Sequence, residues 1–326
     1  PTGDNTPVEP VRRKILLIAL VLGFLIPMVV VYIREKANTT VRGRKDLKKV
    51  NVPFLGEIPF SISRKNRPTL EQRIKFWKKP KEVRMIVVKA GKRDIVNEAF
   101  RVLRTNFEFT IGTHPEQNVI VFTSFNPGSG KSHIAANMAM SLAIKKKKVL
   151  LIDGDLRHGS TSMLIHSPGE GLSDYLNGRI ADIHDILYKG EENGLVKGFD
   201  VIPIGTIPPN PTELLFTPLL EQMIKIMREE YDYVFIDCPP IEVVADTPIY
   251  EQFADRTIFV VRAGLMERSM LPEVNALYKE KKFKNMTLIL NGTKAQGGRY
   301  GSHYGYGYGY GYGYNYNKEK NGGAKS

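Results

Sequence analysis

The sequence predicts an α/β fold, in which a mostly parallel sheet is covered by helices on both faces and is preceded by one transmembrane helix. Two observations predict the sheet: short apolar runs alternate with helical stretches from residue 93 onward, and a glycine-rich turn joins the first run to a helix. A third observation, an uncharged run of 19 residues near the start, predicts the membrane helix.

The predicted elements follow from apolar runs and from helix signals. The expected strands cover residues 118–124, 149–153, 199–204, 233–237, 257–262 and 286–291. The expected helices cover residues 94–110, 131–147, 212–230 and 268–282, with Asp94 as the N-cap of the first. Strands this apolar are typical of a parallel sheet that is buried on both faces.

The membrane helix is predicted at residues 15–33 (ILLIALVLGFLIPMVVVYI). At about 1.5 Å per residue, a helix of this length crosses the hydrocarbon core of a bilayer. Seven basic residues follow the run within residues 34–49 and three precede it, which places the following residues in the cytoplasm. A secretory signal peptide is the alternative, although no small-residue cleavage site follows the run.

The composition fits one large globular domain with additional segments. The chain has 326 residues, of which 42% are apolar, and a single cysteine, Cys238, so that no intrachain disulfide can form. A reducing compartment fits this cysteine content. The formal net charge of +13 favours an anionic partner, which is nucleic acid, phospholipid or phosphate. Because the first residue is Pro1, we expect a fragment or a processed chain.

We divide the chain into five segments. They are an external stub (1–14), the transmembrane helix (15–33), a basic juxtamembrane region (34–90), the α/β domain (91–295) and a tyrosine-rich tail (296–326). Within the juxtamembrane region, residues 45–59 are expected to form a short helix and then a strand that ends at Pro59. Residues 63–81, rich in Arg and Lys, are predicted as a solvated linker, with an anionic membrane surface as the alternative location.

A phosphate-binding loop is predicted between the first strand of the α/β domain and its helix. It reads TSFNPGSGKS from Thr123 to Ser132. Backbone N–H groups of such a turn surround phosphate oxygens, and the helix N-terminus adds a favourable dipole. Lys131 would reach the β- and γ-phosphates and Ser132 would bind Mg²⁺. The loop departs from the usual P-loop pattern at Phe125, where a glycine is expected.

Three aspartates follow predicted strands and would lie beside this loop. Asp153 and Asp155 belong to the segment VLLIDGDLR, and Asp237 belongs to VFIDCPP. A single strand-end aspartate often only caps a loop, whereas three beside a P-loop predict a Mg²⁺ site. We assign Asp153 and Asp237 to metal binding. We assign Asp155 to the acceptance of the phenol proton of a tyrosine side chain. Arg157 would either orient phosphate or pair with an aspartate.

The order of these motifs resembles the bacterial tyrosine kinases of capsular and exopolysaccharide export, the cytoplasmic part of polysaccharide co-polymerases. The P-loop is followed by I-D-x-D-x-R and then by I-D-x-P-P, and the resemblance covers most of the chain. It implies a P-loop NTPase fold and an ATP-dependent protein-tyrosine autokinase in the bacterial inner membrane, with Mg²⁺ as a second cofactor. It also implies an earlier membrane span and an external domain. The candidate nucleotide-binding residues are Pro127, Gly128, Ser129, Gly130, Lys131, Ser132, His133, Arg157 and Asn291, and the candidate catalytic residues are Lys131, Asp153 and Asp155.

The segment Glu98-Ala-Phe-Arg101-Val-Leu-Arg104 matches the family's E-x-x-R-x-x-R helix. The resemblance implies that this helix packs on a neighbour and builds a homo-oligomeric ring, with an octamer as the candidate stoichiometry. A solvated helix face with intrahelical Glu–Arg pairs is the alternative. A cognate tyrosine phosphatase and the polysaccharide polymerase and export machinery are the other implied partners, and no nucleic acid partner is expected.

The tail carries a row of tyrosines that does not resemble core. From Tyr304 to Tyr316 every second residue is Tyr, and the spacers are Gly or, once, Asn. Glycine weakens strands and offers no packing surface, so we predict a flexible tail with accessible phenols. The alternative is a low-complexity tail without chemistry. The candidate phosphoacceptors are Tyr300, Tyr304, Tyr306, Tyr308, Tyr310, Tyr312, Tyr314 and Tyr316.

Two other functions stay open. Partition and division-site ATPases have the P-loop K-G-G-x-G-K-[ST], and the place of their first lysine is taken here by Asn126. The other function is a scaffold for polysaccharide chain length that binds nucleotide without transferring phosphate.

Overall fold

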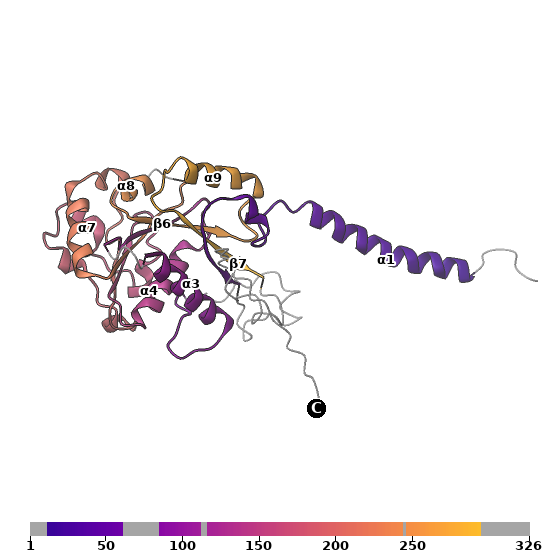
Figure 1. Ribbon diagram of the computed structural model, residues 1–326, viewed down its shortest axis with the longest axis horizontal. Coiled ribbons are helices and arrows are strands. Elements are labelled where there is room, and N and C mark those ends of the chain that lie inside the picture. Colours follow the sequence, from indigo (N-terminus) through magenta and orange to yellow (C-terminus); the bar gives the residue numbers. More distant parts are fainter. Residues whose placement is uncertain (1–11, 61–84, 112–115, 244–245, 295–326) are drawn as a thin grey trace, which may run out of the picture. The chain divides into compact units, whose positions relative to one another are not determined.

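The computed structural model describes residues 12–60, 85–111, 116–243 and 246–294 (Figure 1). The predictions for residues 63–81 and for all eight tail tyrosines therefore lie outside the described residues. Within them, the fold class predicted from the sequence is confirmed.

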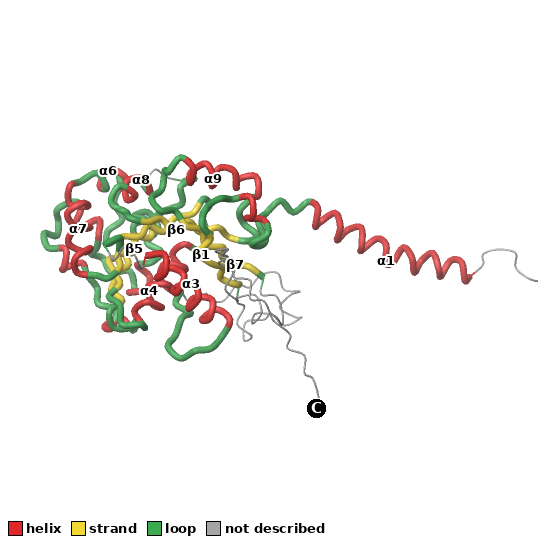
Figure 2. The backbone as a smooth tube through the Cα atoms, in the orientation of Figure 1, coloured by secondary structure: helices red, strands yellow, loops and turns green. Residues whose placement is uncertain are grey.

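The core of the chain is a seven-stranded sheet with the order β1-β7-β6-β2-β5-β3-β4 (Figure 2). Every pairing between neighbouring strands is parallel. The strands are β1 (Phe54–Pro59), β2 (Val119–Ser124), β3 (Val149–Asp153), β4 (Phe199–Ile202), β5 (Tyr233–Asp237), β6 (Arg256–Arg262) and β7 (Thr287–Thr293). Their carboxyl ends share one edge of the sheet, where an open α/β fold binds its ligands.

Helices cover both faces of this sheet because successive residues of each strand point to opposite sides. On one face, α3 (Ile95–Ile111) and α4 (Lys131–Ala143) pack on Ile120 and Phe122 of β2. On the other face, α5 (Leu172–Leu176), α7 (Pro218–Glu230) and α8 (Thr247–Glu251) pack on Val119 and Val121. The helix α9 (Leu271–Lys279) packs on β6 and β7.

The strand expected to end at Pro59 is β1, and it lies in the sheet rather than outside the domain. It pairs with β7, and its residues Leu55 and Ile58 are buried against α3. Residues 54–59 were assigned to the juxtamembrane region, so this boundary was drawn too late in the chain. The pairing joins segments more than 200 residues apart, which local sequence patterns do not reveal.

Three predicted helices are shorter than expected, and one of them, expected at residues 268–282, is α9 (Leu271–Lys279). The helix expected at residues 212–230 is divided into α6 (Pro211–Leu214) and α7, which begins at Pro218. Proline has no N–H to donate and favours the first turn of a helix. The helix expected to reach residue 147 ends at Ala143, and Lys146 has a positive φ of 65°.

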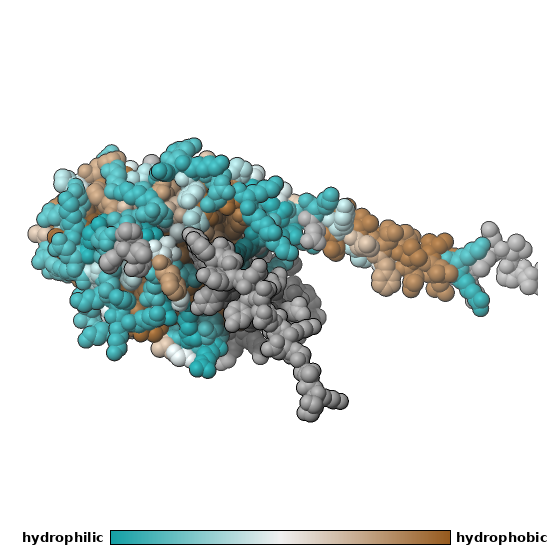
Figure 3. Space-filling view, in the orientation of Figure 1, coloured by the Kyte–Doolittle hydropathy of each residue, from teal (hydrophilic) through white to brown (hydrophobic). Residues whose placement is uncertain are grey.

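Among the described residues, one helix is long and apolar enough to cross a membrane. It is the part Arg13–Arg34 of α1 (Arg12–Lys36), in which an 18-residue stretch has a mean hydropathy of 2.9. Figure 3 shows the apolar side chains along α1. This agrees with the membrane span predicted at residues 15–33 by length and composition.

Candidate nucleotide-binding site

The glycine-rich loop connects the carboxyl end of β2 to Lys131, the first residue of α4. Gly128 and Gly130 have φ values of 73° and 88°, in the left-handed region that favours glycine. A Cβ atom at Gly130 would lie 2.3 Å from Nδ2 of Asn291, so a larger residue would have to displace that side chain. The loop is therefore built around backbone groups, as phosphate binding requires.

The two unusual residues of the loop have structural roles. Phe125, where the usual pattern has glycine, is buried and packs in the core beside β6 and β7. Asn126, where partition ATPases have lysine, donates from Nδ2 to Oε2 of Glu242 at 2.8 Å. Its carbonyl accepts the Ser129 hydroxyl at 2.7 Å, which closes the turn on itself.

Two side chains from neighbouring strands hold the carbonyl groups of the loop. Asn291 Nδ2 donates to the Ser129 carbonyl at 2.9 Å, and Arg262 Nη1 donates to the Gly128 carbonyl at 2.8 Å. Asn291 was predicted as a nucleotide-binding residue, and the structure places it under the loop. Arg262 was not among the predicted site residues, because only the pairing of β6 with β2 brings it to the loop.

The aspartates that end β3 and β5 lie side by side. Asp153 and Asp237 are register partners, and both side chains are fully buried. Asp153 Oδ2 accepts the N–H and the hydroxyl of Ser162, each at 2.7 Å. The other oxygen of Asp153 and both oxygens of Asp237 have no hydrogen-bond partner among the described residues. Buried polar atoms are normally bonded, so these oxygens are available to a bound ion or water.

The raised pKa values of Asp153 and Asp237 also favour a bound cation. Burial raises the pKa of Asp237 to about 7, an effect that the Lys131 charge opposes and the neighbouring Asp153 charge reinforces. Burial also raises the pKa of Asp153. A divalent cation would restore the charged carboxylates, since hard cations such as Mg²⁺ prefer oxygen ligands. The unpartnered oxygens therefore fit a metal bound beside the P-loop.

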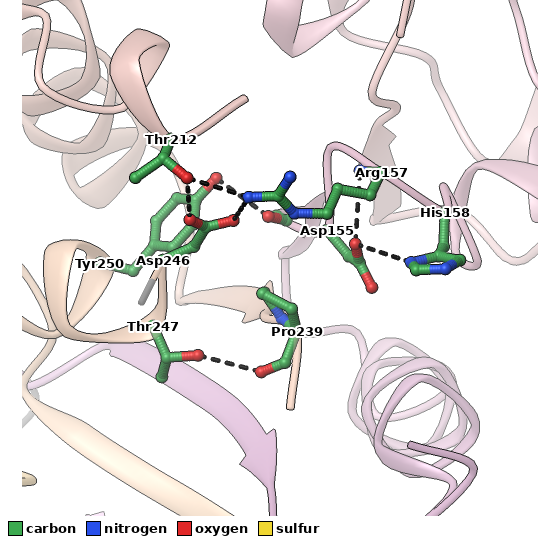
Figure 4. Close-up of polar contacts among 9 residues, drawn as sticks. Asp155, Arg157, His158, Thr212, Pro239, Asp246, Thr247 and Tyr250 are labelled. Atoms are coloured by element: carbon green, nitrogen blue, oxygen red, sulfur yellow. Dashed lines mark hydrogen bonds and ion pairs between the residues drawn. The ribbon is translucent and has the colours of Figure 1, made fainter. Parts of the chain in front are cut away.

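Asp155 lies just beyond the strand and is almost completely buried. Its Oδ1 accepts the N–H of Arg157 at 3.3 Å and faces Nδ1 of His158 at 3.3 Å (Figure 4). The Arg157 side chain instead contacts Thr212 Oγ1 at 2.9 Å and Asp246 Oδ2 at 3.4 Å. Of the two roles considered for Arg157, the structure shows pairing with an aspartate.

His133 lies on α4 but packs toward α3. Its ring meets Phe100 edge-on with centroids 6.1 Å apart, and its Nδ1 is 3.3 Å from Asn137 Nδ2. Burial lowers the pKa of this imidazole. These contacts give His133 a packing role between two helices.

The three charged residues of the E-x-x-R-x-x-R segment in α3 have partners within their own chain. Glu98 and Arg101 form an ion pair, and Arg101 also donates to the Lys92 carbonyl at 2.8 Å. Arg104 Nη1 donates to the Ser141 carbonyl on α4 at 2.8 Å. The intrahelical pairing considered from the sequence is present, and a role of these residues between subunits stays a prediction.

Known proteins are similar to this chain in sequence and in architecture. The AAA domain family matches residues 117–262. The tyrosine-protein kinase Wzc of Salmonella typhimurium is 33% identical over 261 residues, which is 78% of this chain and 34% of that protein. The tyrosine-protein kinase CpsD of Streptococcus agalactiae is 34% identical over 208 residues, which is 63% of this chain and 87% of that protein.

A solved structure, the kinase domain of the Escherichia coli tyrosine kinase ETK, matches with a TM-score of 0.66 and 30% identity. The match covers 82% of this chain and 100% of that domain. The chain spans about a third of the length of the Wzc-type relatives, and most of the length of CpsD. Because it covers most of the kinase CpsD at 34% identity and the whole of a solved kinase domain, the chain belongs to the family of bacterial tyrosine kinases.

Proposed function

We propose that the protein is an ATP-dependent protein-tyrosine kinase that phosphorylates the tyrosine cluster of its own C-terminal tail. One observation carries the proposal: two fully buried aspartates with unpartnered oxygens lie side by side at the sheet edge where the P-loop begins. Such carboxylates disfavour the folded state unless a cation binds them. The family and the tyrosine row of the tail support phosphoryl transfer to tyrosine as the reaction at this site.

Residues of this chain would divide the chemistry as follows. The loop N–H groups and Lys131 bind the phosphates, and Ser132, Asp153 and Asp237 hold Mg²⁺. When bound, Mg²⁺ would offset the negative charge on the transferred phosphoryl group.

Asp155 receives the proton of the attacking tyrosine. A phenol has a pKa of about 10, so it needs a proton acceptor near neutral pH. The phenol oxygen attacks the γ-phosphorus, the bond from that phosphorus to the ADP oxygen breaks, and the proton passes to Asp155. The Arg157 N–H and His158 hold one oxygen of Asp155 in place.

We propose that transfer occurs between subunits of a ring. The 22 residues from Lys294 to Tyr316 give the tail a reach of about 25 Å as a flexible chain. Glu98 and Arg101 are exposed enough to exchange their mutual pair for contacts with a neighbour. Arg104, which is only 12% exposed, would have to leave α4 to do so.

The proposal includes a setting and partners. The kinase domain and tail would lie in the cytoplasm at the inner membrane, held there by α1. The phosphorylation state of the tail would regulate capsular or exopolysaccharide polymerisation and export, and a cognate phosphatase would reset it. We expect no nucleic acid partner.

A mixing experiment tests transfer between subunits. A Lys131→Met chain with an intact tail is combined with an active chain that lacks the residues after Lys294, and both are given Mg-ATP. We expect the tail of the inactive chain to become phosphorylated, which mass spectrometry of that tail detects. Each chain alone is the control.

The outcomes of this experiment separate the alternatives. Self-labelling of the full-length chain without labelling of the mixed inactive chain would contradict transfer between subunits. Binding of ATP without any tyrosine label would favour the scaffold. ATP hydrolysis without tyrosine label would favour an ATPase of the partition type.

Charge would make the ring reversible. Each phosphotyrosine adds about −1.5 to −2, so eight would add roughly −12 to −16 against a formal charge of +13. Crowded tails would then repel one another, and heavy phosphorylation should release the subunits. Sedimentation before and after ATP measures this, and an assembly of unchanged size would contradict it.

A further inference from the structure

Two side chains, Arg262 and Asn291, donate hydrogen bonds to carbonyl groups of the phosphate-binding loop. No sequence motif predicts that these two residues act together. Arg262 and Asn291 are register partners at the carboxyl ends of β6 and β7. Arg262 bonds the carbonyl of Gly128 at 2.8 Å, and Asn291 bonds the carbonyl of Ser129 at 2.9 Å. Two consecutive carbonyl groups are thus fixed by two neighbouring strands.

Peptide geometry converts these contacts into an orientation of the loop N–H groups. In a trans peptide the carbonyl and the next N–H point in opposite directions. Holding the Gly128 carbonyl toward β6 therefore turns the Ser129 N–H away from the strand. The Asn291 contact turns the Gly130 N–H away in the same manner. Within the described part of the chain, neither N–H has an acceptor.

The loop backbone would not keep this orientation without help. Glycine at positions 128 and 130 leaves the peptide groups free to rotate, because glycine adopts positive and negative φ with similar ease. A rotation of the Gly128 peptide would bring its carbonyl oxygen to the side where phosphate binds. Arg262 opposes that rotation with a charge-assisted hydrogen bond, which is stronger than a neutral one.

We propose that Arg262 is a positioning residue for nucleotide binding: its guanidinium holds the Gly128 carbonyl so that the Ser129 N–H faces the β-phosphate, beside the Gly130 N–H that Asn291 orients. The inference rests on the proposed nucleotide site and not on tyrosine transfer. Because ATP and ADP share the β-phosphate, Arg262 should contribute equally to the binding of both. A guanidinium that touched the γ-phosphate directly would matter for ATP alone.

Calorimetric binding of Mg-ADP and of Mg-ATP to the full chain in detergent micelles tests this. Arg262→Met should weaken the binding of both nucleotides by a similar factor of about tenfold or more, the range expected for a charge-assisted hydrogen bond. Arg262→Lys keeps one cationic donor and should recover part of the affinity, because only one N–H of Arg262 makes the contact. The melting temperature without nucleotide should stay close to that of the wild type.

The matched control is Arg268→Met. Arg268 follows β6 in the same loop but pairs with Asp46 at 3.2 Å, so its removal should leave the binding of both nucleotides unchanged. Loss of ATP binding alone in Arg262→Met, or loss that follows a lower melting temperature, would overturn the positioning role. If Arg262→Met does not fold, the ratio of ATP to ADP affinity in Arg262→Lys decides in the same way.

The experiment also separates this inference from the proposed function. A wild-type chain that binds neither nucleotide would overturn the nucleotide site and the inference with it. Normal wild-type binding together with unchanged binding by Arg262→Met would overturn only the role of Arg262.

Discussion

Buried aspartates occur in two regions of this domain, and their surroundings differ. On α5 and β4, Asp174 and Asp200 have partners on both carboxylate oxygens. Asp174 accepts from Gly171, Thr206 and Arg179, and Asp200 accepts from Gly190, Tyr231 and Lys189. At the ends of β3 and β5, Asp153 and Asp237 leave three of four oxygens without a partner among the described residues.

The difference separates a structural role from a functional one. A buried carboxylate with filled hydrogen bonds holds loops together and stabilises the fold. A buried carboxylate without them destabilises the fold until a ligand arrives. The strand-end aspartates therefore indicate the binding site, although all four residues are acidic and buried.

The largest expected effect is on activity. Asp237→Asn should lower kcat/KM for ATP by about 10³-fold, or roughly 4 kcal/mol, because it removes a metal ligand and a charge. The control is Asp200→Asn. Because Asp200 lies outside the site, this variant should be as active as the wild type. Rates of tail phosphorylation measure both. Equal losses in the two variants would contradict the division between the two regions.

The free energy of unfolding should change with pH because of Asp237, by about as many kcal/mol as the loss of activity described above. Below pH 4, Asp237 is protonated in both the folded and the unfolded chain. Between pH 4 and 7 the unfolded chain loses this proton while the folded chain, with a pKa raised from 3.8 to about 7, keeps it. The free energy of unfolding should therefore fall by up to about 4 kcal/mol as pH rises through this window, and level off above it.

In the Asp237→Asn variant, the free energy of unfolding should not show this fall between about pH 4 and 7. Denaturant unfolding of the metal-free chain in detergent between pH 4 and 8 measures the difference between variant and wild type. Parallel curves for the two chains would show that Asp237 does not carry a raised pKa.

A smaller effect is expected at Asp155. Asp155→Asn should reduce phosphate transfer by about 100-fold or more, roughly 3 kcal/mol, since general bases contribute at least this much. Its affinity for Mg-ADP should stay within about threefold of wild type, because the residue is not assigned to the metal. A loss of nucleotide affinity equal to that of Lys131→Met would make Asp155 a metal ligand instead.

The smallest effect concerns stability alone. Asp174→Ala leaves two N–H groups and Arg179 without their acceptor, and should lower the free energy of unfolding by about 2 kcal/mol. Its affinity for Mg-ADP should be unchanged. Chemical denaturation and calorimetry measure the two quantities, and weakened binding at constant stability would contradict a purely structural role.

Several features were determined by the sequence because their causes are local. The P-loop requires glycine, lysine and serine at fixed spacing between a strand and a helix, and this pattern is legible at residues 128–132. Alternating apolar strands and helices predicted the parallel sheet, and a long uncharged run predicted the membrane helix. The strand-end positions of Asp153 and Asp237 predicted that they would meet, since parallel strands end at the same edge.

Other features were decided only by the tertiary structure, because they join residues distant in sequence. The strand β1 joins the sheet through β7, more than 200 residues later, and no local pattern announces that pairing. Arg157 could have faced phosphate or an aspartate, and the packing of α6 and α8 placed Thr212 and Asp246 beside it. Arg262 ends an ordinary apolar strand, and its contact with the P-loop exists only because β6 is the neighbour of β2.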